Sequence, residues 1–294
     1  MKKGYLIVNG FLREDKFTSL YASLCQSAER HDIKLELKTN IELMYDIASG
    51  SAVSYNEPRG FAIFWDKDVR LARALEKRGM RLFNSSAAIE LCDDKALCHI
   101  ALMDKVPQPK TVLIPLTFPR IGYTDTAFLE RIGDYLGYPL VLKQCFGSFG
   151  AQVYMANDIE EAEAMLMKLS GEAAIAQQYI QTSFARDVRA YVAGERVAAA
   201  MLRYNESGDF RANVARGGSV RPYRLSADEE KLAVTAAKTL GCDFAGVDLL
   251  FGKDGMLVCE VNSNAHFDGI KKATGINVAD AIMEAVAQAL ADNA

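Results

Sequence analysis

The chain of 294 residues lacks the marks of several large classes of protein. Its six cysteines include no CxxC pair, so we expect reduced thiols rather than a disulfide framework or a zinc site. No apolar run approaches the length that spans a membrane, and the N-terminus shows no cleavage pattern. The net charge of −4 argues against a protein built chiefly to bind nucleic acid. These absences favour a cytoplasmic protein without a membrane segment.

A glycine pattern for dinucleotide binding is also missing. The first strand-like run, Tyr5–Val8, leads into Asn9-Gly-Phe-Leu, which lacks the GxGxxG spacing that lets a backbone approach a pyrophosphate. The segment still alternates strand and helix patterns, with a buried run at Phe61–Trp65 and a charged helix from about Val69 to Arg78. This succession predicts a parallel sheet with crossover helices. Such a sheet would serve as a scaffold or as the wall of a binding site on the side of an acceptor substrate.

The middle of the chain predicts a helix, a buried strand and a loop. The helix begins at a cap near Asn84–Ser86, carries Asp93-Asp94-Lys95 and ends before Val106–Pro109. Lys143 lies in the apolar strand Leu140–Gln144, where a lysine needs an anion or a carboxylate to offset its desolvation. The following loop, Cys145–Gly150, contains two glycines and leads into another strand. We therefore predict a hairpin flap over phosphates, although glycines also suit an ordinary turn.

Arginine is the only basic residue between positions 186 and 224, where it occurs eight times. Such a choice suggests bidentate recognition of phosphate or carboxylate. The alternative is a set of solvated strand faces, which we expect for Arg196 in the turn-like Ala193–Arg196. A patch that binds RNA is a further alternative, but no interleaved aromatic motif accompanies the arginines.

Near the C-terminus, two apolar runs flank Lys253-Asp254-Gly255 and predict a β-hairpin. With these three residues as the loop, the expected cross-strand pairs are Gly252–Met256, Leu250–Val258 and Asp248–Glu260. Side chains alternate along a strand, so one face would carry Asp248, Glu260 and Asn262. The other face would carry Val247, Leu249, Cys259 and Val261.

Two directly opposed carboxylates repel each other unless a cation lies between them. Two carboxylates and an amide form an all-oxygen ligand set, which suits magnesium or manganese rather than zinc. The alternative is an edge hairpin with solvated acids. From the hairpin alone both interpretations stand, because a slip of one residue would separate the acids.

Taken in order, these motifs resemble those of the ATP-grasp ligases, and more narrowly the RimK-type ligases. The matching elements are Asp94-Lys95, Lys143 with its glycine loop, Gln177–Ile180, Asp187-Val-Arg189, Arg203, Asn213–Gly218, Ala245–Asp248 and Glu260-Val-Asn262. The resemblance covers about residues 84 to 290. It implies an α/β (α+β) fold with a Rossmann-like pre-ATP-grasp domain at 1–88 and a two-lobed ATP-grasp fold. The central lobe with the flap would span 89–173, and the lobe with the metal hairpin 174–294.

The resemblance also implies roles for individual residues. The α- and β-phosphates of ATP would be neutralised by Lys95 and Lys143 and covered by the loop of Gly147, Ser148, Phe149 and Gly150. The adenine hinge would be formed by Gln178, Tyr179 and Ile180, and the ribose would be contacted by Asp187. Two Mg²⁺ or Mn²⁺ ions would be held by Asp248, Glu260 and Asn262. The γ-phosphoryl group would be stabilised by Arg203, and the phosphate and the acceptor carboxylate positioned by Arg189, Asn213 and Arg216.

Enzymes of this type use ATP to convert a carboxylate into an acyl phosphate, which an amine then attacks to form an amide. The implied partners are ATP, a carboxylate acceptor on a peptide, a protein tail or a small molecule, and an amino acid such as glutamate. The alternatives are a free dipeptide ligase and a regulatory module that holds ATP without turnover. We also expect a homo-oligomer.

The loop after the metal strand departs from the family pattern. Ser263–Asp268 replaces the small residue, serine, proline and glycine that usually follow Asn262. This loop borders the incoming amine in the family, so the amine donor need not be glutamate. His266 in the loop is a candidate for a role at the acceptor site or in deprotonating the amine.

Overall fold

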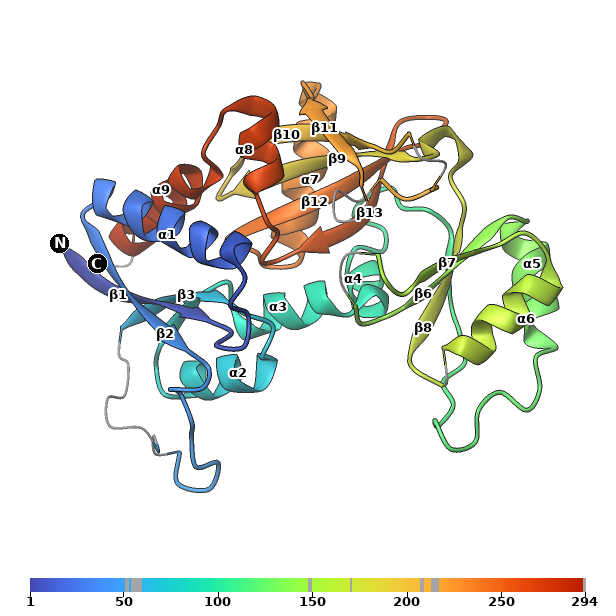
Figure 1. Cartoon of the computed structure of the whole chain (residues 1–294), viewed down its shortest axis with the longest axis horizontal. Helices are drawn as coiled ribbons and strands as arrows, with labels where there is room; N and C mark the ends of the chain where they lie inside the picture. Colours follow the sequence, from blue (N-terminus) through green and yellow to red (C-terminus); the bar gives the residue numbers. More distant parts are fainter. Residues whose placement is uncertain are drawn as a thin grey trace.

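The computed structural model describes residues 1–50, 53, 60–147, 150–169, 171–206, 209–212 and 217–292. These residues form three β-sheets with helices packed on their faces (Figure 1). The N-terminal and central sheets lie at opposite ends of that view. The expected mixed α/β fold is confirmed, whereas the division of the chain after residues 88 and 173 stays a prediction. No helix of the described residues is long and apolar enough to cross a membrane.

The N-terminal sheet is parallel, as predicted from the alternation of strands and helices. In the order β2-β1-β3-β4, its strands are β1 (Lys2–Val8), β2 (Ile33–Thr39), β3 (Phe61–Trp65) and β4 (Arg81–Phe83). Successive side chains of a strand point to opposite faces. Leu6 and Ile63 therefore meet α1 (Asp15–Arg30) on one face, while Ile7 and Phe64 meet α2 (Val69–Lys77) on the other.

The central sheet is antiparallel, and two helices cover one of its faces. In the order β5-β8-β6-β7, its strands are β5 (Thr111–Leu113), β6 (Leu140–Gln144), β7 (Val153–Ala156) and β8 (Ala174–Gln178). Leu140 and Leu142 are fully buried beneath α5 (Phe128–Leu136) and α6 (Ile159–Lys168). Alternation along β6 therefore turns Lys143 toward the opposite face. After β8, the chain passes through the short 3₁₀ turn η1 (Gln181–Ser183).

The C-terminal sheet is also antiparallel and has helices on both faces. In the order β11-β10-β9-β12-β13, its strands are β9 (Arg186–Ala193), β10 (Arg196–Tyr204), β11 (Ser219–Pro222), β12 (Phe244–Phe251) and β13 (Met256–Asn262). Val188 and Val247 pack with α3 (Ser86–Asp93), α4 (Lys95–Ala101) and α7 (Ala227–Thr239). Tyr191 packs on the other face with α8 (Asp268–Thr274) and α9 (Val278–Ala291).

One hydrophobic core joins the N-terminal sheet to the C-terminal sheet. The helix α9 contributes Ile282 and Met283 to a buried cluster that also contains Leu6 and Leu24. Two hydrogen bonds tie the end of α9 to the first sheet, because Lys2 Nζ donates to the carbonyl of Leu290 and Arg81 to that of Ala289, each at 2.9 Å. The first and last segments of the described chain are thus packed against each other.

The single helix predicted after Ser86 is in fact two helices. Asp94 has an extended backbone (φ −97°, ψ 110°), which ends α3 and starts α4. Its carboxylate accepts the N–H groups of Ala96 at 2.8 Å and Leu97 at 3.1 Å, so it caps α4. The N–H of Lys95 donates to the carbonyl of Cys145 at 3.0 Å. The break therefore fixes Lys95 beside the loop that follows β6.

The C-terminal hairpin has a longer turn than the predicted one. Phe251 pairs with Met256, so four residues, Gly252–Gly255, form the loop. Leu250 is opposite Leu257 rather than Val258, and Gly252 is not paired with Met256. These two predicted pairs are wrong, because the turn occupies one residue more than its glycine signal indicated.

A β-bulge at Cys259 restores the register at the acidic pair. The bulge gives β13 one extra residue, so Asp248 is opposite Glu260 as predicted. The extra residue also breaks the alternation of side chains. Cys259 consequently lines the same cavity as Glu260, whereas it was predicted on the opposite face.

Candidate active site

A cavity of about 1010 Å³ lies where the three sheets converge. It is lined by every predicted site residue that the structure describes: Lys95, Lys143, Gly147, Gly150, Gln178, Tyr179, Ile180, Asp187, Arg189, Arg203, Asp248, Glu260 and Asn262. The other four predicted residues, Ser148, Phe149, Asn213 and Arg216, lie outside the described residues. Segments from about position 95 to position 262 therefore supply the walls of one site.

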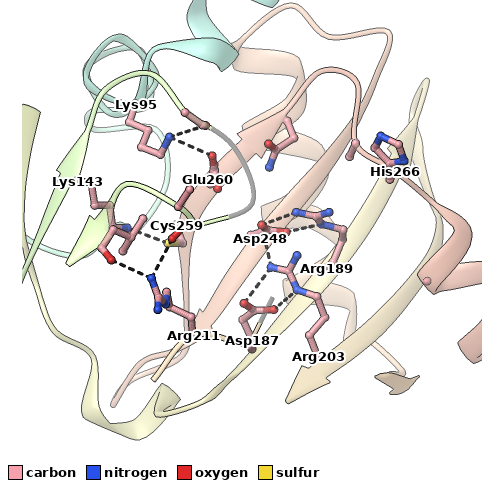
Figure 2. A pocket seen from close by; sticks show the side chains of 18 of the residues that line it. Lys95, Lys143, Asp187, Arg189, Arg203, Arg211, Asp248, Cys259, Glu260 and His266 are labelled. Atoms are coloured by element: carbon pink, nitrogen blue, oxygen red, sulfur yellow. Dashed lines mark hydrogen bonds and ion pairs between the residues drawn. The ribbon is translucent and has the colours of Figure 1, made fainter. Parts of the chain in front are cut away.

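Lys95 lies between the loop after β6 and the acidic hairpin. Its Nζ donates to the carbonyl of Gly147 at 3.2 Å and lies 3.6 Å from Oε1 of Glu260 (Figure 2). The Lys95 side chain is 11% exposed, so its charge acts in a partly desolvated setting. The lysine thus joins the flap side of the cavity to the predicted metal strand.

Lys143 is held by neutral groups. Its Nζ donates to Oε1 of Gln177 at 2.6 Å and lies 3.5 Å from Sγ of Cys259, whose pKa is raised by burial. Gln177 in turn contacts Nε2 of His99 at 3.0 Å. Burial, followed by the charge of Lys143, lowers the pKa of His99 to about 4, so this imidazole is neutral at pH 7.

No carboxylate in the described part of the chain forms an ion pair with Lys143. The desolvation argument from the sequence required either an anion or a carboxylate beside this lysine. With its protein partners neutral, the Lys143 charge is available to an anion in the cavity.

Two arginines and two aspartates form a buried cluster on β9, β10 and β12. Arg189 binds Asp248 through two hydrogen bonds of 2.7 Å, and Arg203 binds Asp187 through bonds of 2.6 and 2.9 Å. Arg203 also reaches Asp248 at 2.9 Å, so Asp248 lies between the two guanidinium groups (Figure 2). Burial raises the pKa of the Asp248 carboxyl, but Arg189 and Arg203 outweigh burial and hold that pKa below its usual value.

The predicted metal ligands are oxygen donors of the kind that a hard cation takes, although both oxygens of Asp248 accept from Arg189 and would have to leave or share these bonds. Asp248 and Glu260 are opposed across the hairpin, and Asn262 lies two residues further along β13. The side-chain nitrogen of Asn262 is buried without a hydrogen-bond partner among the described residues. Since the oxygen and nitrogen of an amide are interchangeable by a flip, the Asn262 oxygen is free to act as a ligand there. This all-oxygen set fits magnesium or manganese, although no group of three His, Cys, Asp or Glu side chains assembles in the described segments.

Arg211 is a functional candidate that the sequence did not distinguish from its neighbours. Its guanidinium donates to the carbonyls of Gly150 and Val153 at 3.0 and 3.1 Å, and it is anchored to Asp209 at 2.8 Å. It therefore ties the loop after β10 to the flap. Arg196, by contrast, has a side chain that is 54% exposed and pairs with Glu284, which confirms the expected solvated face.

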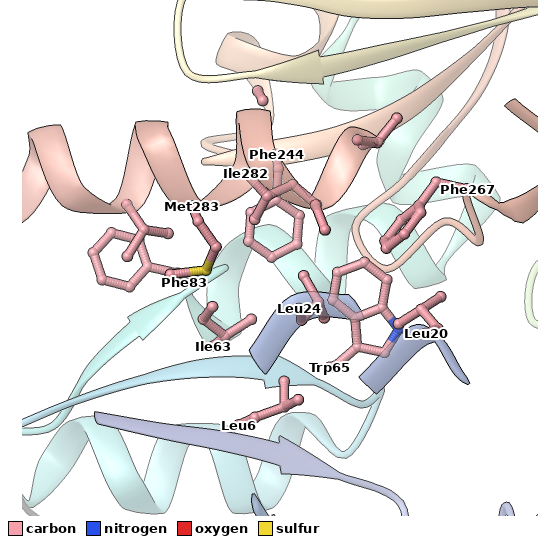
Figure 3. Packing of buried hydrophobic residues seen from close by; sticks show 14 of the residues in the cluster. Leu6, Leu20, Leu24, Ile63, Trp65, Phe83, Phe244, Phe267, Ile282 and Met283 are labelled. Carbon is pink, nitrogen blue, oxygen red and sulfur yellow. The ribbon is translucent and has the colours of Figure 1, made fainter. Parts of the chain in front are cut away.

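The loop that follows the metal strand is anchored at both ends. Asn84 donates to the carbonyl of Ser263 at 2.8 Å, and Phe267 packs edge-on against Trp65 with ring centres 5.9 Å apart (Figure 3). Between these anchors, His266 lines the cavity with its ring 5.1 Å from that of Phe17. Burial lowers the pKa of His266. The altered loop thus faces the N-terminal wall of the cavity.

The fold of this chain is shared with solved ligase structures, one of them an ATP-grasp ligase. The structure of D-alanine–D-alanine ligase from Bacillus anthracis in complex with ATP matches with a TM-score of 0.72 at 16% identity, covering 100% of this chain and 99% of that one. The ATP-grasp ligase PsnB, complexed with a phosphomimetic variant of a minimal precursor, Mg and ADP, matches with a TM-score of 0.69 at 16% identity, covering 98% and 99%.

Within this class, the chain belongs to the RimK-like family. The family model described as RimK-like ATP-grasp domain matches residues 92–286. A probable alpha-L-glutamate ligase 2 from Shewanella denitrificans is 38% identical over 215 residues, which cover 72% of this chain and 69% of that protein. The chain is therefore an ATP-using enzyme of the class that joins a carboxylate to an amine and forms ADP.

Proposed function

We propose that the protein is an ATP- and magnesium-dependent ligase that joins an amino acid to the carboxylate of a peptide, a protein tail or a small molecule. The observation that carries this proposal is the convergence, in one cavity, of unpaired positive charge with an all-oxygen acidic hairpin. Among the described residues, the partners of Lys143 are neutral, and Asp248 and Glu260 are opposed on β12 and β13. Phosphates and a hard cation are the ligands that suit this combination.

Nucleotide binding in this proposal uses the central sheet and the segment after β8. Lys95 and Lys143 neutralise the α- and β-phosphates, and the loop at Gly147 and Gly150 covers them. Gln178, Tyr179 and Ile180 border the adenine. A ribose contact by Asp187 requires the carboxylate to leave its two hydrogen bonds with Arg203 or to share them. Cytoplasmic placement and self-association stay predictions from the sequence.

Two magnesium ions would be held by Asp248, Glu260 and Asn262 and would supply positive charge to the phosphate oxygens. Arg203 and Arg189 lie beside these ligands, where they bring further positive charge to the γ-phosphoryl group. Asn213 and Arg216 retain their predicted role of positioning the phosphate and the acceptor carboxylate.

The reaction then proceeds in two displacements. An oxygen of the acceptor carboxylate attacks the γ-phosphorus of ATP, and ADP leaves, which gives an acyl phosphate. The nitrogen of the amine attacks the carbonyl carbon, loses a proton, and the C–O bond to phosphate breaks, which gives an amide and inorganic phosphate. Positive charge from the cavity offsets the charge that develops on the transferred group, and no protein nucleophile is required.

The test is ADP release by the purified protein with Mg-ATP and a crossed panel of amino acids, dipeptides and acidic peptide tails. We expect release only when one carboxylate and one amine are both present, and a product lighter than their sum by one water. Release with two free amino acids alone would identify a dipeptide ligase. Tight ATP binding with no ADP release and no phosphate exchange for any pair would contradict the ligase and identify a regulatory module.

A further inference from the structure

Two residues that line the cavity, Asp66 after β3 and Tyr21 on α1, each carry a buried polar atom without a partner among the described residues. Asp66 is 7% exposed and Tyr21 is 6% exposed, and both line the cavity. Oδ2 of Asp66 and the hydroxyl of Tyr21 have no hydrogen-bond partner among the described residues. Buried polar groups in proteins are nearly always hydrogen-bonded, because an unsatisfied one costs stability. Two such atoms on residues that line one cavity point to a ligand group that would reach them.

The place of Asp66 in the sheet also favours a ligand site. Val8 at the end of β1 pairs with Trp65 at the end of β3, so Asn9 and Asp66 follow neighbouring strands at their carboxyl ends. The chain leaves β1 for β2 on one side and returns to β3 on the other side, so the strand order reverses between β1 and β3. Ligands of parallel α/β sheets bind in the crevice beyond such a reversal.

No cation of the described residues forms an ion pair with the carboxylate of Asp66. Its Oδ1 accepts the N–H of Lys67 at 2.7 Å and Nδ2 of Asn9 at 3.3 Å, both neutral donors. The ammonium of the adjacent Lys67 pairs with Asp93 at 2.5 Å, and that of Lys16 pairs with Glu14 at 2.6 Å. Burial raises the pKa of Asp66, and burial together with the charge of Asp66 raises that of Tyr21 to about 12. A cationic ligand beside Asp66 would therefore stabilise the ionised form of this carboxyl, which burial disfavours.

A primary ammonium fits this site better than a metal ion. One carboxylate oxygen and one phenol hydroxyl supply too few ligands for magnesium or calcium, which take six or more oxygens. An ammonium has three donors, and the phenol and carboxylate oxygens accept two of them. Trp65 and Phe17 also line the cavity, and aromatic faces attract cations: the ammonium of Lys16 lies over the Phe17 ring, 4.9 Å from its centre.

We propose that Asp66 and Tyr21 bind the primary ammonium group of the amine substrate. This inference rests on the proposed ligase function and names a residue pair that selects its second substrate. Asp268, the first residue of α8, adds another carboxylate to the cavity. The amine end is therefore suited to a substrate with a free ammonium, carried either by an α-amino group or by an amine at the end of an alkyl chain.

The test compares two variants with a matched control in the full chain. Asp66→Asn keeps an oxygen that accepts from Lys67 and Asn9, and it replaces only the unpartnered oxygen by a donor. Tyr21→Phe removes only the unpartnered hydroxyl. Asp68→Asn is the control, because it removes one negative charge only two residues from Asp66. The Asp68 side chain caps α2 and does not line the cavity.

Binding is measured by calorimetric titration with a non-hydrolysable ATP analogue and magnesium present. The probes are the twenty L-amino acids and cadaverine, each paired with its counterpart that lacks the amino group. We expect at least one amine to bind, with an affinity that falls about 10- to 100-fold in Asp66→Asn and about 3- to 10-fold in Tyr21→Phe. Asp68→Asn should bind it normally. Binding of amino acids that carry only an α-amino group would indicate a site for an α-ammonium, whereas binding of cadaverine would indicate a site for an ammonium at the end of an alkyl chain.

Three results would overturn the inference: no amine binds the wild-type protein, Asp66→Asn binds it equally well, or the counterpart without the amino group binds as tightly. Thermal unfolding provides a second readout. Removing unsatisfied buried groups should leave the unfolding temperature unchanged or raised. A fall of more than about 5 °C in both variants would assign a structural role to the pair instead.

A hydroxylamine assay distinguishes failure of this inference from failure of the ligase proposal. Hydroxylamine is a small neutral nucleophile that converts an acyl phosphate into a hydroxamate without using the ammonium site. Equal hydroxamate formation in the wild type and Asp66→Asn, with equal amine affinity, would remove the inference alone. Absence of hydroxamate from every carboxylate in the panel, with amine binding intact, would remove the ligase proposal alone.

Discussion

Replacing the two opposed acids of the hairpin should have unequal effects on stability, although both replacements should abolish magnesium-dependent turnover. Asp248 is 5% exposed and belongs to a buried cluster in which two guanidinium groups face two carboxylates. Asp248→Asn leaves Arg189 and Arg203 opposed by Asp187 alone. An uncompensated buried charge costs about 3–5 kcal/mol of unfolding free energy, which lowers the unfolding temperature by on the order of 10 °C.

Glu260→Gln is the matched comparison. The Glu260 side chain is 29% exposed and its nearest cation is Lys95 at 3.6 Å, so its removal should cost at most about 1 kcal/mol. Thermal and urea unfolding without ATP or magnesium measure both variants, and ADP release measures turnover. In the double variant Asp248→Asn/Arg189→Met, the remaining charges are again balanced. It should regain most of the lost stability but no activity.

The reasoning fails if the free energy of unfolding of Asp248→Asn is within about 1 kcal/mol of the wild-type value, because the two guanidinium groups would then tolerate the loss of the Asp248 charge. It also fails if the double variant is no more stable than the single one. Turnover that persists in Asp248→Asn or Glu260→Gln would remove the metal assignment.

Three further predictions concern the cavity. Lys143→Met should weaken ATP binding about 10- to 100-fold, and unchanged affinity by calorimetry would make Lys143 structural. Arg211→Gln should speed amide hydrogen exchange at Ala151 and Gln152, because the flap loses the hydrogen bonds from Arg211 to the carbonyls of Gly150 and Val153. Exchange at the wild-type rate would show that Arg211 does not hold the flap. The lowered pKa of His99 means that the unfolded state binds more protons than the folded state below about pH 6.5. Acidification from about pH 6.5 to pH 4 should therefore lower the free energy of unfolding of the wild type by about 3 kcal/mol more than that of His99→Gln. Equal losses of free energy in urea unfolding would contradict this prediction.

Most elements were predictable because their signals are local. The strand Phe61–Trp65 and the helix from Val69 to Lys77 follow directly from runs and periodicities of apolar side chains. The break at Asp94 was missed although an aspartate is a favoured helix cap. The hydrogen bond from Lys95 to Cys145 helps to fix that break, and it joins residues fifty positions apart. No periodicity within either segment reports such a contact.

The described residues of the predicted site line one cavity, but the contacts among them were not predictable from the sequence. The pairing of Asp248 with Glu260 was predicted from a turn that is one residue too short, and the bulge at Cys259 cancels the error. Nothing in the arginine-rich segment indicated that Arg211 reaches the flap, because that contact depends on the path of the loop after β10. Asp66 did carry a signal, since it ends a buried strand of a parallel sheet, but a lone acid at a strand end suits many loops.

The packing of α9 against the first sheet has a consequence for synthesis on the ribosome. Leu6 and Leu24 are made early, yet the cluster that buries them also needs Ile282 and Met283 (Figure 3). The helix α1 covers part of this face of the N-terminal sheet early, but the rest of the cluster stays exposed to solvent and to other nascent chains until α9 has been translated. Contacts this distant in sequence slow folding and prolong the exposure of apolar surface. A chain that stops before α9 would present that surface permanently, and we expect it to be a substrate for chaperones and proteases.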